Sequence, residues 1–415
     1  MTDGNGYLAR YKKHNLLSAL MAGIGLALIF TGTRYIASFL SQRMHASDFS
    51  HLYPGVRMLR EGLDVYTTGL PEYIRQTGLP FNQSMELVTD SPLVLWLGQP
   101  LAWLSPVPAF AALVAMQAVS LAIVLAVGWR LLGRRLSPSA WIFTAGLTLC
   151  SMPMFVHFWS TQVQLSLLAL LLGGHYLLRR GAVVWATGLM ALAGMLKLYP
   201  LALLPYPILA TQGIQRRRAV ATAAVVIAAG LFLPGPDQWL SFARSIVPYL
   251  ASFADGRGLN FTLLSFVNGL TGNRAAARAI GSGLAAAILL FTWFHSARAL
   301  RRHATAATDS CFCLLLISSL VCSAIAWTHY LVFLIYPLLL IAADIHPARG
   351  HRRFYLCVLL VSSLFIVNTA RSDRFTPDTS LGTFLAGQAP LLLLLILYVH
   401  FTMEIRGARA DRSPG

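Results

Sequence analysis

Long apolar runs, separated by short polar or basic stretches, follow one another along the whole chain. About 20 apolar residues suffice for a helix to cross the hydrocarbon core of a bilayer. The pattern therefore predicts an all-α, polytopic membrane protein, in which the shorter spans tilt or pack around a wet cavity. We expect about twelve spans, roughly over residues 16–40, 107–132, 139–156, 160–178, 182–196, 198–214, 218–234, 276–298, 309–326, 328–345, 353–370 and 381–403.

Composition supports this prediction. Of the 415 residues, 56% are hydrophobic and 11% are charged, whereas soluble domains carry about 25% charged residues. The net charge of +17 would suggest nucleic acid for a soluble protein. Here the basic residues lie in short clusters between apolar runs, which is typical of topology signals and lipid head-group contacts. We expect membrane lipids as partners and no nucleic acid.

The basic clusters also predict sidedness. Seven clusters hold 20 of the 32 arginines and lysines, and basic loops favour the cytoplasm. All seven share that side if residues 92–105 do not cross and if the stretch 182–214 breaks near Pro200, which disfavours helix at the preceding residue. The loop 41–106 is then outside, residues 1–404 form one membrane domain, and residues 405–415 form a short cytoplasmic tail.

Most of the acidic residues and an isolated lysine fall on the predicted outer side. Ten of the 15 acidic residues fall there, six of them between Ser41 and Ser91. Lys197, the only lysine after residue 13, falls on the same side. An ionisable residue at membrane depth is a functional candidate, although a lysine that snorkels to the interface is the plainer interpretation.

The first outer loop is expected to hold an amphipathic helix on the outer leaflet. Its apolar positions recur at helical spacing, and Pro54 requires a kink or a helix start nearby. Asp48 is either the N-cap of this helix, worth about 1 kcal/mol, or a carboxylate held at the membrane surface to take a proton. The segment Gly62–Tyr66 is expected to form the turn after the helix, with a structural role for Asp64. The apolar positions are Phe49, Leu52, Tyr53, Val56 and Leu59.

Short motifs follow in a fixed order. They are Asp48, Gly62-Leu63-Asp64-Val65-Tyr66, Trp159-Ser160-Thr161-Gln162-Val163-Gln164, Lys197-Leu198-Tyr199-Pro200, Asn260-Phe261-Thr262 and Ala326-Trp327-Thr328-His329-Tyr330. In order and spacing they resemble the polyprenyl-phosphate-dependent membrane glycosyltransferases of the GT-C fold, in particular glycosyltransferase family 87. The resemblance covers about residues 10–400. The chain departs from the family pattern at Asp90-Ser91-Pro92, at Ser160-Thr161 in place of a glycine, and at Tyr330 in place of a second histidine.

The resemblance implies transfer of a hexose, with mannose the expected sugar, from a polyprenyl-phosphate donor. The acceptor would be a lipid-linked glycan or glycolipid on the extracytoplasmic side of a bacterial cytoplasmic membrane. Asp48 occupies the place of the family's general base. Lys197, His329, Gln162, Asn260 and Trp327 are the candidates for binding the donor phosphate or sugar.

One carboxylate suits this chemistry. It removes the proton as the acceptor hydroxyl attacks the anomeric carbon with inversion, and the leaving phosphate needs positive charge more than a proton. For His329, Gln162 and Asn260 a hydrogen-bonded structural role is the alternative. Arg371 and Arg374 are weaker phosphate candidates.

No cofactor or metal is expected. No Gly-rich phosphate loop is present, and beyond Asp48 and Asp64 no clustered acid pair suggests an ion. Two other classes stay open: a transporter or flippase of a lipid-linked sugar without catalysis, and a structural scaffold. Transporters often show internal repeats, and no obvious repeat relates the two halves of this chain.

Overall fold

The computed structural model describes residues 4–44, 47–81, 87–132, 135–252, 260–301, 305–343 and 388–407. Every regular element within these ranges is helical, which confirms the all-helical prediction. The predicted span 353–370, Arg371, Arg374 and most of the predicted tail lie outside the described residues.

Four described helices are long and apolar enough to cross a membrane. Two bent pairs pass the same criterion together: α6 with α7, bent by 51°, and α11 with the helix Pro236–Leu250, bent by 88°. The described residues thus hold four to six such spans, and other predicted spans correspond to shorter apolar helices. The four long helices are α1 (Gly4–Arg43), α5 (Pro106–Leu132), α15 (Arg274–Leu300) and α20 (Ala389–Gly407).

The remaining helices are shorter. They are α2 (Phe49–Arg60), α3 (Leu70–Thr77), α4 (Pro92–Gly98), η1 (Gln99–Trp103), α6 (Pro138–Leu149), α7 (Met152–Ser160), α8 (Gln164–Arg179), α9 (Val183–Leu196), η3 (Tyr199–Leu203), α10 (Pro205–Leu209), α11 (Gly213–Phe232), α12 (Pro236–Ser241), η4 (Phe242–Ile246), α13 (Val247–Ser252), α14 (Leu263–Thr271), α16 (Thr305–Val321), η6 (Thr328–Leu334) and α17 (Ile335–Ala343).

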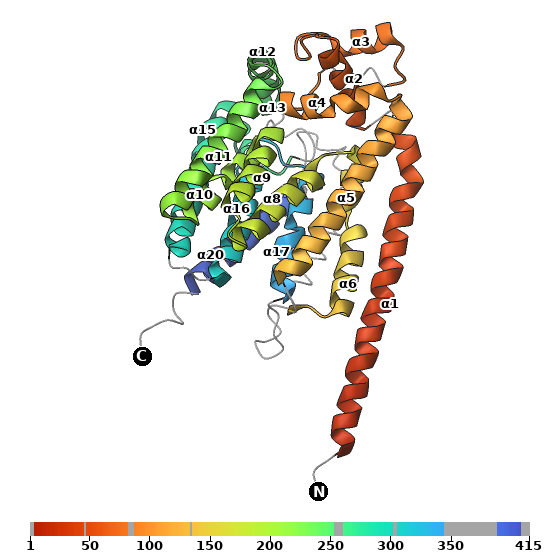
Figure 1. The fold of residues 1–415 in the computed structure, drawn as a ribbon, viewed down its shortest axis with the longest axis vertical. Helices are drawn as coiled ribbons and strands as arrows, with labels where there is room; N and C mark the ends of the chain where they lie inside the picture. The colour runs from red at the N-terminus through yellow and green to blue at the C-terminus, as the bar shows by residue number, and fades with distance from the viewer. Residues whose placement is uncertain are drawn as a thin grey trace.

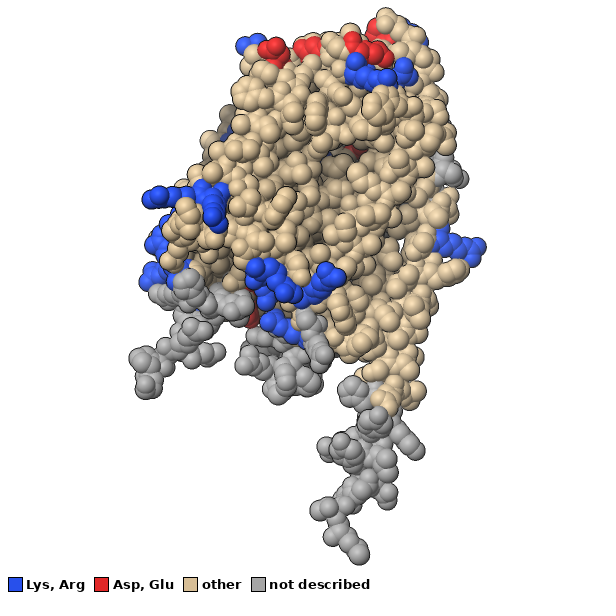
Figure 2. Space-filling view, in the orientation of Figure 1, with Lys and Arg blue, Asp and Glu red and all other residues tan. Residues whose placement is uncertain are grey.

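The small helices of the first loop gather at one end of the molecule. Figure 1 shows α2, α3 and α4 there beside α12 and α13, whereas the first turn of α1 and the end of α20 lie toward the opposite end. In Figure 2 the acidic side chains on the visible face cluster at the loop end, and most of the basic ones lie toward the other. This arrangement agrees with the predicted division of charge between two sides, and which side is cytoplasmic stays a prediction.

The two interruptions required by the charge pattern are present. Residues 92–105 form only α4 and η1, and α9 ends at Leu196, after which Lys197 is extended (φ −142°, ψ 133°). Pro200 lacks the amide hydrogen that would bond to the carbonyl of Leu196 in a continuous helix. The hydroxyl of Ser91 donates to that carbonyl instead, at 2.8 Å. A residue of the first loop therefore satisfies the end of α9.

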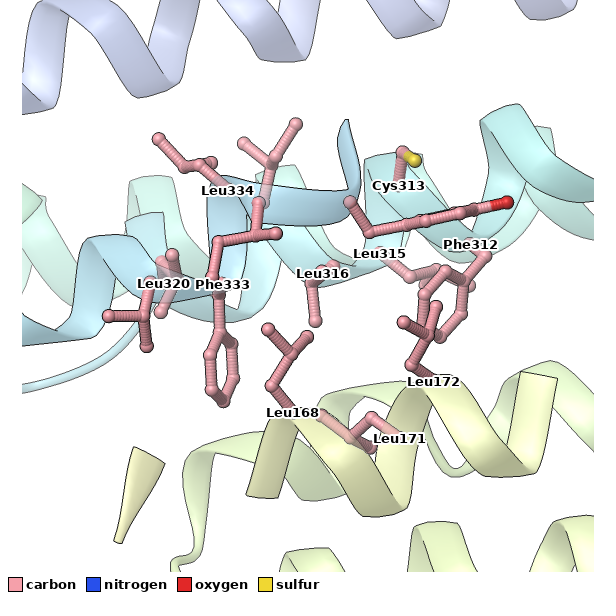
Figure 3. Packing of buried hydrophobic residues seen from close by; sticks show 14 of the residues in the cluster. Leu168, Leu171, Leu172, Phe312, Cys313, Leu315, Leu316, Leu320, Phe333 and Leu334 are labelled. Carbon is pink, nitrogen blue, oxygen red and sulfur yellow. The ribbon is translucent and has the colours of Figure 1, made fainter. Parts of the chain in front are cut away.

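The main core lies between α8, α16 and η6 (Figure 3). Leu168 and Leu172 of α8 are buried, as are Phe312 and Leu316 of α16 and Phe333 of η6. Between membrane helices, close van der Waals packing replaces the hydrophobic effect as the main source of association. The packing keeps α8 in the interior, so the turn that precedes it is held firmly.

A second core fastens the first loop to the helices below it. The ring of Phe49 contacts Tyr53 at a centroid distance of 5.4 Å, Phe81 at 5.8 Å and Phe110 of α5 at 5.3 Å. The predicted amphipathic helix is present as α2, but its apolar face packs on protein rather than on the leaflet, since nine of its 12 residues are buried. Pro54 lies inside α2 and does not end it.

Close packing of α1 on α6 gives a stability prediction. A Cβ atom on Gly25 would lie 2.6 Å from the backbone nitrogen of Phe143, whereas one on Gly23 would meet nothing within 4 Å. Gly25→Leu is expected to destabilise the protein by about 1–3 kcal/mol through overpacking. Gly23→Leu on the same helix is the matched control. Thermal unfolding in detergent measures both, and equal midpoints would contradict this account of the α1–α6 contact.

Candidate active site

The start of α2 is hydrogen-bonded to the turn between α7 and α8. The backbone nitrogen of Asp48 donates to the carbonyl of Ser160 at 3.1 Å. That of Phe49 donates to Oγ1 of Thr161 at 3.2 Å, and the same Oγ1 lies 3.0 Å from Oγ of Ser47. These contacts bring together segments more than 110 residues apart and fix Asp48 at the turn.

Thr161 explains how the turn tolerates a departure from the family pattern. Its φ of 50° and ψ of 42° place it in the left-handed region, where a β-branched residue is a genuine outlier and glycine is favoured. The hydroxyl of Thr161, which glycine lacks, makes the contacts to the first loop. The strain at this residue is therefore offset by docking of the loop.

Asp48 precedes α2 without capping it through its side chain. Its carboxylate makes no capping hydrogen bond, so the side-chain N-cap interpretation is wrong. Oδ1 instead lies 3.8 Å from Nε2 of His51, and 24% of the side chain is exposed. The carboxylate is held near one partner and remains accessible.

His51 lies between two carboxylates. Its Nδ1 is 3.4 Å from Oδ2 of Asp90, and the side chains of His51 and Asp90 are only 6% and 11% exposed. Burial opposes a charged imidazole, but Asp48 and Asp90 outweigh it and raise the pKa of His51 to about 10. Burial likewise opposes ionisation of Asp90, yet His51 and then Lys197 hold its pKa below the usual range. His51 and Asp90 are therefore both expected to carry charge at neutral pH.

Neither His51 nor Asp90 is distinguished by the sequence motifs. The available signal was the spacing of Asp48 and His51, three residues apart at the start of a predicted helix, which places side chains on one face. The tripeptide that begins at Asp90 stood out only as a departure from the family pattern. Their proximity depends on tertiary structure.

Lys197 lies beside this group. Ser91, which follows Asp90, bonds to the carbonyl of Leu196, which precedes Lys197. Nζ of Lys197 donates to Oε1 of Gln162 at 2.9 Å and lies 5.6 Å from the centre of the Tyr330 ring. Within the described ranges no carboxylate oxygen lies within 4.0 Å of Nζ. Its positive charge is thus left without a direct counter-ion.

Buried polar atoms without a partner gather near Lys197. Lys197 acts electrostatically on His157 and His329, and Nε2 of His157 lies 3.2 Å from Oε1 of Gln117. An unpaired buried polar group costs about 1–3 kcal/mol, so a group of them indicates a place that water or a ligand fills. The unpartnered atoms are Nε2 of Gln117, Nδ1 of His157, Oε1 of Gln164 and Nε2 of His329.

The remaining donor-binding candidates lie around His329. Its ring is 2% exposed and packs at 5.7 Å from Trp327 and 4.8 Å from Tyr330. Oδ1 of Asn260 accepts from the nitrogen of Ala326 at 2.9 Å, and its Nδ2 lies 3.3 Å from the carbonyl of Ala324. Asn260 thus supports the backbone before Trp327. A direct role of His329 or Asn260 in donor binding stays a prediction.

Asp64 has the structural role expected of it. Its Oδ1 accepts from the nitrogen of Tyr66 at 3.0 Å, and its Oδ2 accepts from Oγ of Ser241 at 2.7 Å. Partial burial opposes ionisation, but these hydrogen bonds lower the pKa of Asp64. The residue fastens the turn after α2 to the end of α12.

The arrangement brings together an accessible carboxylate, a cation without a direct carboxylate partner, and unpartnered buried polar atoms. Asp48, Gln162, Lys197 and His329 are linked through the turn after α7 and the break after α9. Figure 2 shows a hollow below the loop helices with acidic atoms inside it. A carboxylate can take a proton there while the cation and buried donors hold an anion.

One comparison with known proteins finds a match. The sequence model of glycosyltransferase family 87 matches residues 89–324, more than half of the chain. The matched stretch contains Asp90, Gln162, Lys197 and Asn260. It begins after Asp48 and ends before Trp327 and His329. No curated protein matches the chain.

Proposed function

The chain belongs to glycosyltransferase family 87 and is thus a glycosyltransferase, and from this premise we propose its donor, acceptor and reaction. The donor is a hexose, with mannose the expected sugar, linked to a polyprenyl phosphate. The acceptor is a lipid-linked glycan or a glycolipid. Asp48 is the base, and Lys197 and His329 bind the phosphate.

One observation carries this proposal. The backbone of Asp48 is hydrogen-bonded to Ser160, and two residues further along the same turn Gln162 binds Nζ of Lys197. The residues that carry the acidic and the cationic group are therefore both hydrogen-bonded to one short turn. Displacement of a phosphate by a hydroxyl requires this pairing of a base with an anion site.

The reaction balances with these groups. The acceptor oxygen attacks the anomeric carbon while the carboxylate of Asp48 takes the hydroxyl proton. The bond from the anomeric carbon to the phosphate oxygen breaks, and the polyprenyl phosphate leaves with the electron pair. Attack opposite the leaving group inverts the anomeric configuration. Asp48 suits the role better than Asp90, because 24% of its side chain is exposed against 11%.

The leaving phosphate would lie against the cation. Lys197 has no carboxylate within 4.0 Å in the described part of the chain, and Nε2 of His329 is buried without a partner. Donors that are fixed in a buried site stabilise developing negative charge without reorganising. We propose that Gln162 and Trp327 contact the sugar.

The site's position favours a lipid-linked donor. The helices of the first loop lie at the end of the helix bundle opposite the first turn of α1, and we propose that a carrier's tail stays in the bilayer while its phosphate reaches the polar groups there. If basic clusters face the cytoplasm, this end faces the extracytoplasmic side. We propose a bacterial cytoplasmic membrane as the location.

Reconstitution tests the donor and the reaction. The purified protein in liposomes is supplied with polyprenyl-phosphate mannose, polyprenyl-phosphate glucose or a nucleotide sugar, together with lipids extracted from the host membrane as acceptors. We expect a new glycosylated lipid and free polyprenyl phosphate from a carrier-linked donor only. Product formed from the nucleotide sugar alone would reject the lipid carrier. Comparison of lipid-linked glycans from cells with and without the gene then identifies the acceptor.

A further inference from the structure

His51 makes a buried contact that the proposed reaction does not use directly. It lies on the first turn of α2 with its ring covered by protein, and it is 3.8 Å from Asp48 through Nε2 and 3.4 Å from Asp90 through Nδ1. Asp90 comes from the segment before α4, whereas Asp48 is held by the turn after α7. One imidazole therefore joins two carboxylates from different parts of the fold.

We propose that His51 is a positioning residue for Asp48, held in orientation by Asp90 on its other nitrogen. Asp90 attracts the Nδ1 side of the ring at 3.4 Å without a hydrogen bond to it, and Nε2 faces the carboxylate that takes the acceptor proton. This inference rests on the proposed function, because it assigns His51 to the base of that reaction. Asp90 is likewise a positioning residue rather than a second base.

The charges around His51 fit this role. Among the described residues the charged groups that face it are Asp48 and Asp90, and the charge of Lys197 acts on Asp90. The segment 92–129, which covers α4, η1 and most of α5, contains no titratable side chain. On α3, Glu72 and Arg75 pair with each other at the surface. The pKa of His51, raised to about 10, keeps the ring cationic at neutral pH.

A cation at this position has two consequences for the base. Its positive charge attracts the carboxylate of Asp48, 3.8 Å away, and offsets the negative charges of Asp90 and the donor phosphate. It also restricts the carboxylate to one side of the site. No proton transfer to His51 is required, since the proton taken from the acceptor stays on Asp48 until the product leaves.

Two substitutions test the proposal in sugar transfer. His51→Gln removes the charge and keeps a polar side chain, and Asp90→Asn removes the partner on Nδ1. Each is expected to lower kcat about 10²-fold, the cost of a displaced reacting group, while KM for the donor changes little.

The double variant separates positioning from direct catalysis. If Asp90 acts only through His51, the double variant is within about twofold of the slower single variant, because residues that act in series are not additive. Glu72→Gln removes a surface carboxylate of the same loop and should transfer sugar at the wild-type rate. A folded His51→Gln protein with wild-type kcat overturns the proposal, as does a fully additive loss in the double variant. If His51→Gln fails to fold, Asp90→Asn alone decides by the same kcat comparison.

A readout independent of transfer separates this inference from the proposed function. The pKa of folded His51 is above its ordinary value of 6.5, so its stabilisation is complete below about pH 6.5 and is lost as the pH rises through about 10. The thermal unfolding midpoint of the wild type should fall over that pH range. In Asp90→Asn the same fall should begin at lower pH, because His51 has lost one of its two carboxylate neighbours. If the wild type transfers no sugar, the proposed function fails. The unfolding midpoints still test the contact between His51 and Asp90. If the wild type and Asp90→Asn show the same dependence on pH, the inference is wrong.

Discussion

Asp48→Asn is expected to lower the rate of sugar transfer about 10²–10⁴-fold, the contribution of a positioned general base. The amide has nearly the same shape as the carboxylate but cannot accept the acceptor proton. Folding should be preserved, because the backbone of Asp48 rather than its side chain bonds to Ser160. The measurement is the initial rate of glycolipid formation from a carrier-linked hexose in liposomes.

Binding of the donor should survive this change. We expect the Asp48→Asn protein to retain the carrier lipid with an affinity close to that of the wild type, since the phosphate ligands are untouched. Glu72→Gln, on the exposed face of α3, is the matched control for loss of one carboxylate from the loop. Transfer by Asp48→Asn at the wild-type rate would show that the base lies elsewhere and would reject the mechanism.

Lys197→Met is expected to lower kcat about 10²–10³-fold, the effect of removing one preorganised group that stabilises developing charge. Methionine keeps most of the apolar stem, so the packing at the break after α9 should change little. The loss should appear mainly in kcat, because the phosphate gains negative charge as the sugar bond breaks. Lys197→Arg should recover part of the rate, since it restores the charge but with a planar, larger head.

Arg75→Gln provides the control for Lys197. It removes a positive charge at the same end of the molecule, from a side chain that is 68% exposed and paired with Glu72, and exposed pairs contribute little. A Lys197→Met protein with unchanged kcat and a raised KM would instead assign Lys197 to ground-state binding alone. Wild-type kinetics would make it a lysine that snorkels to the interface.

Much of the fold follows from local sequence. The all-helical class, the helix after Asp48, the interruption at residues 92–105 and the break after Leu196 all follow from periodicity, charge and proline. These features depend on neighbouring residues and on the polarity of the surroundings. The position of α2 does not, because an apolar stripe has the same spacing whether it faces lipid or protein. Its burial on Phe110 could not be read from the pattern.

The candidate site was predicted only in part for the same reason. Asp48, Lys197 and His329 are unusual within their own segments, as an acid after a span, an isolated lysine and a histidine between apolar runs. His51 and Asp90 are ordinary loop residues until the fold brings them within 3.4 Å of each other. Contacts between segments far apart in sequence carry no local signal, and no periodicity encodes them.

The hydroxyl of Ser91 sets a constraint on how any carrier lipid reaches Lys197. It supplies the hydrogen bond that Pro200 cannot, and it does so from a stretch 105 residues earlier in the chain. If the segment around Ser91 moved away to widen the path to Lys197, the last carbonyls of α9 would lose their hydrogen-bond donor. Lys197, which follows them, would then be held less firmly. Opening this approach for a substrate would therefore cost the hydrogen bond that holds Lys197 in place. A route that keeps Ser91 bonded to Leu196 costs less free energy.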